Sequence, residues 1–375
     1  ASHRCGPLEQ VFLNGIDVPL DANGEPTSTP YYDGTTRYLK FSYRNGETDQ
    51  AIDPLLDTDF PSLPSTFRQR GHTTVVVKAR YGSNDNAHKD IYGSEGNFNP
   101  LFRFQGAALP DPRAPGFEPD NESTWVFGSS NASLGLIRYL VHPWPNMRLV
   151  DPSKIDWDLV AAAADIDDKW FGKKDGTVER NHTADGVIFS TDDPLEVCRK
   201  FLSSCDGILV NERGKYHVMP GTPRQPVATI HQDMLAGGFE FQSEPADSDL
   251  INIVKTEFVA PDREYNVVVG PVLRDEDAVT ADGRPLETTL SLPLTLGDAR
   301  AQRLAKRKLF ESRGGKSLSI VCTVEAADRT RFKAGNVVRV SLRDFPEVNG
   351  LYQIRRSARE NGMVSRIHID LVSWS

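Results

Sequence analysis

The stretch that decides the fold reads GVIFSTDDPLEV at residues 186–197 and continues as GILVNERGKYHV at residues 207–218. The first run contains a helix start, because Asp193 can cap a helix, Pro194 suits the first helical position and Glu196 can reach back as a capping box. Short β-rich runs lie on either side of this helix and predict strands. The predicted strands are Val187–Phe189, Ile208–Val210 and Tyr216–Val218.

The surrounding block, residues 143–221, shows two amphipathic helical patterns, one beginning after Asp156 and one after Asp193. In each, apolar residues recur at the spacing of one helical face. The predicted buried faces are Trp157, Val160, Ala161 and Ala164 in the first helix, and Leu195, Cys198, Leu202 and Cys205 in the second. The block therefore predicts a small α+β domain, with Trp157 as a buried core residue.

The regions on both sides of this block alternate apolar and polar residues, the period-two pattern of half-buried strands. Before the block, the pattern predicts strands at Val11–Val18, Leu39–Arg44, Val75–Tyr81 and Phe102–Ala108, separated by long loops rich in Gly, Pro, Asn and Asp. After it, the pattern predicts strands at Leu318–Val324, Val338–Leu342 and Ile367–Leu371. Several short, evenly spaced strands favour a sandwich or a barrel.

One predicted helix, residues 298–312, interrupts the last region. Its apolar residues Ala301, Leu304, Ala305 and Leu309 are predicted to face the barrel. Its basic residues Arg300, Arg303, Lys306, Arg307 and Lys308 are predicted to face outward, and they form the candidate partner-contact face. Two interpretations of this face remain open: a solvated helix surface, or a contact with an acidic neighbouring protein.

Size and charge narrow the class of protein. A chain of 375 residues is long enough for two or three domains. We predict three: a first β-rich domain at 1–142, the α+β block at 143–221 and a second β domain at 222–375. With 38% apolar and 25% charged residues, the composition is that of a soluble globular protein. The formal net charge of −9 argues against a dedicated nucleic-acid binder, which would carry a basic excess.

The sequence contains no pattern that specifies catalysis or a cofactor. Gly314–Ser317 reads GGKS, but a phosphate-binding loop needs an earlier glycine and a strand before it, whereas a helix precedes this run. The loop that contains Asp49, Asp53, Asp57 and Asp59 lacks the central Gly and terminal Glu of a calcium-binding loop. The four cysteines are too far apart in sequence to form a metal-binding pair; they are Cys5, Cys198, Cys205 and Cys322. We predict no catalytic residue, no cofactor and no metal.

Four segments resemble one family, in the order in which that family has them. They are NGETDQAIDPLL at Asn45–Leu56, FRQRGHTTVVV at Phe67–Val77, the block at 143–221, and FKAGNVVRV at Phe332–Val340. Together they resemble the hub domains of the tail-tip (central fibre) protein of lambda-like siphophages, with relatives in gene transfer agents and contractile tails. The resemblance spans nearly the whole chain.

The resemblance implies a mainly β, α+β fold, in which two related tail-tube-like β-barrel or sandwich domains flank the small α+β insert. It implies a structural virion protein, made in the host bacterial cytoplasm and located at the tail tip or baseplate. As a homotrimeric hub, the chain would cap the tail tube, contact a distal tail protein, and anchor the tape-measure protein and a tail fibre or receptor-binding protein. Genomic DNA would pass through it without specific binding.

Two other classes of function remain open. One is a tail-associated cell-wall hydrolase, although the sequence lacks the usual nucleophile and zinc motifs of hydrolases. The other is a carbohydrate-binding β protein that would use the long loops of the first region.

Overall fold

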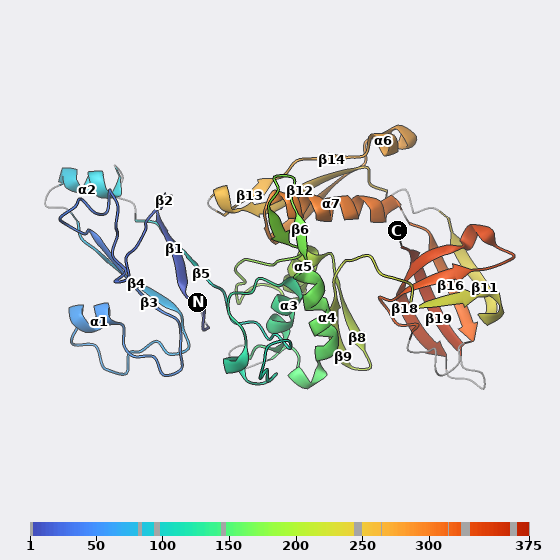
Figure 1. Ribbon diagram of the computed structural model, residues 1–375, viewed down its shortest axis with the longest axis horizontal. Coiled ribbons are helices and arrows are strands. Elements are labelled where there is room, and N and C mark those ends of the chain that lie inside the picture. The colour runs from blue at the N-terminus through green and yellow to red at the C-terminus, as the bar shows by residue number, and fades with distance from the viewer. Residues whose placement is uncertain are drawn as a thin grey trace. The chain divides into compact units, whose positions relative to one another are not determined.

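The protein is represented by a computed structural model, which describes residues 3–81, 85–93, 98–143, 148–243, 250–263, 265–313, 315–323, 331–360 and 366–374. The fold is α+β with more strand than helix, so the predicted fold class is confirmed (Figure 1). The chain divides into two compact units. The first unit comprises Ala1–Pro110 and Ala114–Ser129, and the second comprises Asp111–Arg113 and Ser130–Ser375.

The first unit is a small β structure. Its elements are β1 (Leu8–Leu13), β2 (Ile16–Asp17), β3 (Leu39–Arg44), α1 (Pro54–Asp59), β4 (Thr74–Ala79), α2 (Asp85–Tyr92), β5 (Pro100–Phe104) and the 3₁₀ turn η1 (Glu122–Thr124). Strands β2, β1 and β5 form one sheet, and β3 pairs with β4 in a second. Residues from both sheets share a core, in which Phe41 and Phe102 meet edge to face at 6.2 Å.

The predicted strand at Val11–Val18 is in fact a hairpin. Strand β1 ends at Leu13, and Leu13 pairs with Ile16 across Asn14 and Gly15. Both turn residues have positive φ, 52° and 78°. An Asn-Gly pair adopts this conformation readily, and it matches the twist of the two flanking strands. The apolar positions change phase across the turn, from Val11 and Leu13 to Ile16 and Val18, and this change marks the division of the run.

The middle of the second unit contains three packed helices and two hairpins. Its elements are α3 (Ala132–Val141), the 3₁₀ turn η2 (Pro152–Lys154), α4 (Trp157–Asp167), β6 (Trp170–Gly172), β7 (Val178–Arg180), α5 (Pro194–Cys205), β8 (Ile208–Glu212) and β9 (Lys215–Met219). Helix α3 was not predicted, and it is buried along nearly its whole length. A Cβ at Gly135 of α3 would lie 2.8 Å from the ring of Phe201, so glycine permits α3 and α5 to approach closely.

The helix starts were predicted correctly, and the buried faces only in part, since Val160, Ala164 and Cys205 are buried as predicted. Helix α4 buries Val160, Ala163, Ala164 and Asp167, and Trp157 is only half-buried. Helix α5 buries Val197, Ser204 and Cys205, whereas Leu195 is exposed. Capping residues fix where a helix begins, but the packing of neighbouring elements decides which face is covered. The predicted strand at Val187–Phe189 is also wrong, because this segment pairs with no strand.

A second layer of this unit is a four-stranded sheet with a long helix against it. The elements are β12 (Ile253–Ala260), the 3₁₀ turn η4 (Pro261–Arg263), β13 (Asn266–Val269), β14 (Leu273–Arg274), α6 (Glu276–Asp282), β15 (Glu287–Leu296) and α7 (Asp298–Arg313). Helix α7 lies along β12 and β15 (Figure 1). The predicted apolar face of α7 is buried as expected, but it packs on this sheet and not on the barrel.

The last part of the second unit is a curled six-stranded sheet in the order β10-β17-β18-β19-β16-β11 (Figure 1). Its elements are β10 (Ala228–His231), the 3₁₀ turn η3 (Gln232–Met234), β11 (Leu235–Gln242), β16 (Ser317–Thr323), β17 (Val337–Ser341), the 3₁₀ turn η6 (Pro346–Val348), β18 (Gly350–Glu360) and β19 (Arg366–Ser373). The three strands predicted here are confirmed, although Val324 lies outside the described residues. Their alternating apolar residues form one core inside the curl.

The two flanking β structures differ in strand order, five strands in two small sheets against six in one. Sheet topology therefore gives no support to the internal repeat that the family resemblance implies. Within the described part of the chain, none of the helices combines the length and apolar character needed to cross a membrane.

Candidate functional site

The predicted basic face of α7 is largely occupied by contacts within the chain. Arg300 is buried and donates hydrogen bonds to the carbonyl oxygens of Leu296 (2.8 Å) and Arg180 (3.1 Å). Arg303 pairs with Glu179 and donates to the carbonyl of Asn181 at 3.1 Å. The outward orientation expected of Arg300 is therefore wrong. These two arginines fasten α7 to the β6–β7 hairpin, which the sequence pattern did not place beside it.

Arg307 joins three parts of the second unit. Its guanidinium forms ion pairs with Asp206 at the end of α5 and with Glu311 one turn further along α7 (3.3 Å). It also lies 5.3 Å from the ring centroid of Trp374, which follows β19. One cation therefore connects α5, α7 and the last strand of the six-stranded sheet.

Asp206 carries the most perturbed carboxyl of this cluster. It ends α5 in a left-handed conformation, with φ of 45°. Burial raises the pKa of Asp206 to about 6, because desolvation and the neighbouring Glu311 outweigh the opposing effect of Arg307. Protonation of this one group near pH 6 would change the charge balance where the three parts meet.

Two of the five basic residues remain open to solvent. Lys306 and Lys308 are exposed, and the Lys306 ammonium lies 5.6 Å from the ring centroid of Phe310. The partner contact assigned to this face stays a prediction. If a partner binds here, these two lysines are the residues of the set that it can reach.

A buried Asp–His pair lies where α3, α4 and the segment after β7 meet. His182 Nδ1 lies 2.8 Å from an oxygen of Asp167, whose other oxygen accepts a hydrogen bond from the Ser133 amide at 2.9 Å. Asp167 is fully buried and His182 nearly so. Asn131 caps α3 and also donates to the carbonyl of Ala164 at 3.0 Å. Because the pair is closed to solvent and satisfies the start of α3, it holds elements together and does not present a reactive group.

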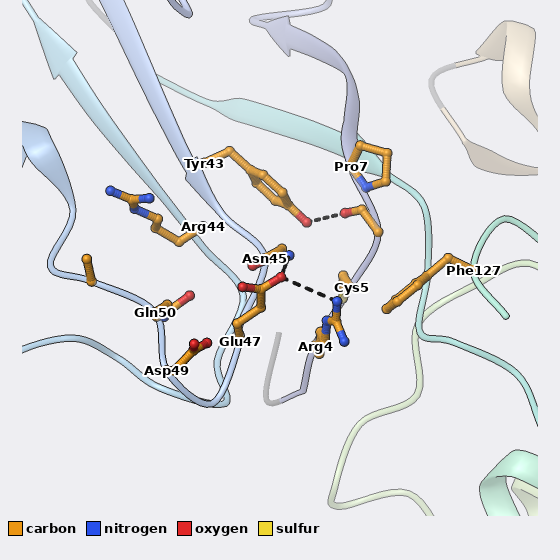
Figure 2. Close-up of a pocket in the computed structure, with 12 residues that line it drawn as sticks. Arg4, Cys5, Pro7, Tyr43, Arg44, Asn45, Glu47, Asp49, Gln50 and Phe127 are labelled. Carbon is orange, nitrogen blue, oxygen red and sulfur yellow. Dashed lines mark hydrogen bonds and ion pairs between the residues drawn. The ribbon is translucent and has the colours of Figure 1, made fainter. Parts of the chain in front are cut away.

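The first unit contains an open pocket of about 590 Å³ (Figure 2). The segment Arg4–Pro7 forms one wall and the chain from Tyr43 to Ala51 the other, with Phe127 beside them. Arg4 lies 5.1 Å from the ring centroid of Phe127 and pairs with Glu47 at 3.3 Å. The Tyr43 hydroxyl donates to the carbonyl of Gly6, and burial raises its pKa to about 12. Several polar groups of the pocket are thus satisfied by each other.

The floor of this pocket joins two of the segments that carry the family resemblance. Gln50 is buried, and its amide nitrogen donates to the carbonyls of Arg68 (2.8 Å) and Gln69 (2.6 Å). Its oxygen accepts from the Gly46 amide at 3.1 Å. Gly46 has φ of 85°, and a Cβ there would lie 2.9 Å from the Thr73 nitrogen. No motif marks these residues, although the Asn-Gly pair at 45–46 signals the turn.

The remaining sequence candidates contribute to local structure. Asp53 caps α1 through the Leu55 amide at 2.9 Å, and Asp59 pairs with Lys78 at 2.7 Å. Three of the four cysteines are buried and Cys198 is half-buried. Gly314 of the GGKS run lies outside the described residues. No group of three or more metal-ligating side chains occurs among the residues that are described.

No protein-family model and no curated protein matches this chain. Among solved structures, it is similar to a tail protein from Neisseria meningitidis MC58, with a TM-score of 0.39 and 14% identity over 51% of this chain and 58% of that one. It is similar to the 43 kDa tail protein of prophage MuSo2 from Shewanella oneidensis, with a TM-score of 0.34 and 11% identity over 49% and 54%.

It is also similar to the prophage tail protein gp18 from Listeria monocytogenes EGD-e, with a TM-score of 0.30 and 12% identity over 50% of this chain and 54% of that one. The chain thus spans little more than half the length of these three proteins. Their TM-scores are too low to transfer a function.

Proposed function

We propose that this chain is a structural subunit of a phage tail: a homotrimeric hub at the tail tip or baseplate. In this role it caps the distal end of the tail tube and contacts the tube or a distal tail protein. It anchors the tape-measure protein on one side and a fibre or receptor-binding protein on the other. It opens to let DNA leave the particle, and it has no catalytic task.

The observation that carries the proposal is that the four family-like segments meet in pairs. Segment 45–56 is fastened to segment 67–77 through Gln50. The block 143–221 meets segment 332–340 through an ion pair of 2.7 Å between Glu212 and Lys333. Segments that resemble a family and also contact each other support a shared architecture more strongly than scattered matches do.

The contact at Gly335 shows how closely segment 332–340 packs against the block 143–221. A Cβ on Gly335 would lie 2.1 Å from the sulfur of Met219, and its φ is 86°. Its carbonyl accepts a hydrogen bond from Arg224 at 3.3 Å. Glycine is therefore required where the FKAGNVVRV segment turns against the end of β9.

Charge supports passage of DNA without retention. Each Lys or Arg that neutralises a phosphate adds affinity through counterion release. The chain has a formal net charge of −9. Three of the five arginines and lysines on the α7 face are engaged by acidic residues of the same chain. We expect weak duplex binding at physiological salt, and sub-micromolar affinity in a fluorescence anisotropy titration would contradict this part of the proposal.

An electron-microscopy reconstruction of the phage particle whose genome encodes this chain tests the hub assignment directly. We expect three copies around the axis at the distal end of the tail tube. Six copies per ring, a single copy, or absence from the particle would refute the assignment. As a functional check, a particle lacking the chain is expected to form no infectious tails, and supplying the chain in trans should restore them.

A further inference from the structure

An exposed apolar strip lies at the start of α5. It consists of Val187, Phe189 and Leu195, which are 72%, 65% and 67% exposed. Ile188, between the first two, is half-buried. Residues 187–189 therefore alternate as a strand would when it rests one side on the protein and presents the other to solvent. Several exposed apolar residues within one short stretch of chain are a candidate interaction site.

Part of the backbone of this strip is unpaired, although the Phe189 amide donates to a carboxylate oxygen of Asp192 at 3.4 Å. The Asp185 amide donates to the carbonyl of Leu294 at 2.8 Å, and the Asp192 amide donates to that of Phe189 at 3.1 Å. Between them, the amides of Val187 and Ile188 bond to nothing in the described part of the chain. A sequence with the pattern of a strand, lying without a partner strand, is suited to pairing with another chain.

A second surface of the same unit has the complementary character. The β6–β7 hairpin, here called the aromatic hairpin, exposes Trp170 and Val178, each 60% exposed, together with Phe171. Its two strands pair only with each other among the described strands. The Arg180 carbonyl of β7 accepts hydrogen bonds from Arg300, so the open outer edge is that of β6. Arg180 stacks 3.9 Å from the Trp170 ring centroid and Arg303 lies 5.1 Å from that of Phe171, which holds the aromatic side chains in place.

The charges around the two surfaces are opposite. Residues 185–196, which contain the apolar strip, include four acidic residues and no Lys or Arg. Two of these acids are paired with basic residues of α5, Asp192 with Lys200 and Glu196 with Arg199. The other two are Asp185 and Asp193. Residues 169–180, which contain the aromatic hairpin, include four basic and two acidic residues. One of those acids, Glu179, is turned toward α7 by its pairs with Arg300 and Arg303. The apolar strip, with acidic residues around it, is therefore complementary in charge to the aromatic hairpin, with basic residues around it.

We propose that the aromatic hairpin of one copy binds the apolar strip of a neighbouring copy of this chain. The outer edge of the hairpin adds residues 186–189 of the neighbour as a third strand. The proposal rests on the proposed function, since it supplies the contact between copies of the hub. Because the two surfaces differ, the contact is heterologous, and it produces a closed ring when the rotation between neighbouring copies closes, as the proposed trimer requires.

Single substitutions on each surface test the contact. Phe189→Glu places a charge in the apolar strip, and Val178→Glu places one on the aromatic hairpin. Each is expected to weaken self-association by about 100-fold or more, the scale for a central apolar interface residue. Phe310→Glu is the matched control, since Phe310 is 54% exposed on α7 and belongs to neither surface. Circular dichroism and thermal melting establish that each variant folds, and native mass spectrometry reports the number of copies.

Mixing the two variants gives the decisive result. A Val178→Glu copy keeps an intact strip and a Phe189→Glu copy keeps an intact hairpin, so one good contact can form between them. We expect each variant alone to be monomeric and the mixture to contain heterodimers. Association of either variant like the wild type overturns the proposal. A mixture that stays monomeric also overturns it, as does a wild-type chain that is monomeric at its highest soluble concentration.

The same measurements separate this contact from the hub assignment. A dimer or tetramer that depends on both surfaces would refute the trimeric hub and retain the contact. A trimer that forms equally well in both variants would retain the hub and refute the contact.

Discussion

Replacement of Asp206 by Asn should change how the stability of the second unit depends on pH. Asp206 ends α5 in a left-handed conformation, which Asn also tolerates, so the backbone need not move. Asn resembles the protonated carboxylic acid in shape and in charge. The variant therefore behaves as a permanently neutral Asp206, and comparison with the wild type isolates the ionisation of this group.

The magnitude follows from the two pKa values. The folded pKa is about 6. An unfolded aspartate has a pKa of about 3.9, so the difference is roughly 2 units, or about 3 kcal/mol. Because the Asp206 side chain is 26% exposed, solvent screening reduces this figure to about 2 kcal/mol. The pKa of Asp206 is higher in the folded state than in the unfolded state. The contribution of this group to the free energy of unfolding is therefore fully present below about pH 4 and is lost as pH rises through 6.

We therefore expect the two proteins to be equally stable at pH 4, and Asp206→Asn to be more stable by about 2 kcal/mol at pH 7.5. Hydrogen exchange of α5 and α7 peptides across a urea series measures this difference. Asp192→Asn is the matched control, because pairing with Lys200 lowers the pKa of Asp192 and the pH dependence has the opposite sign. A difference between wild type and Asp206→Asn that does not vary with pH, or a variant that is less stable at pH 7.5, would refute the reasoning.

Three further predictions concern the buried parts of the second unit. Asp167→Ala should destabilise it by about 2–5 kcal/mol, because the Ser133 amide and the His182 ring lose their acceptor, and a loss under about 1 kcal/mol in urea unfolding would contradict this. Gly335→Ala should cost about 1 kcal/mol more than Gly283→Ala, since both have positive φ but a Cβ at Gly335 must displace the end of the Met219 side chain; equal melting shifts would argue against this. A thiol reagent should modify Cys198 before the buried cysteines, and peptide mapping that finds another first would disprove this.

The six-stranded sheet was the part most open to prediction. Ile367, Ile369 and Leu371 are buried, and His368 between the first two is exposed. One face of β19 lines a core and the other meets solvent, so burial imposes period two on the sequence. Helix starts were predictable for a similar reason, since the Asp193 side chain accepts from the amides of Leu195 and Glu196.

Features set by distant partners could not be predicted. Helix α3 is covered on nearly all sides, so its residues carry no periodic polar face to mark it as a helix. Trp157 follows its cap as expected, but it remains half-buried and its indole nitrogen donates to the carbonyl of Pro152 at 3.1 Å. Arg300 looks like a surface residue in sequence, and its burial depends on partners far away along the chain, the Arg180 carbonyl and the Glu179 carboxylate.

The candidate sites depend even more on long-range placement. Asp167 and His182 belong to no motif, and the chain brings them together only by folding α4 and the β6–β7 hairpin back on α3. Gln50 reads as an ordinary polar residue of a loop, and its role becomes visible only when residues 67–77 lie against it.

The strand order of the six-stranded sheet has a geometric consequence. Its two outermost strands, β10 and β11, are consecutive in the chain and are joined by Gln232–Met234 alone. Laid flat, six strands would hold those edges about 24 Å apart, since neighbouring strands lie about 4.8 Å from each other. The link from His231 to Leu235 reaches at most about 15 Å. The short link therefore limits how far apart the two edge strands can lie, and the sheet can flatten only if the link is cut or lengthened.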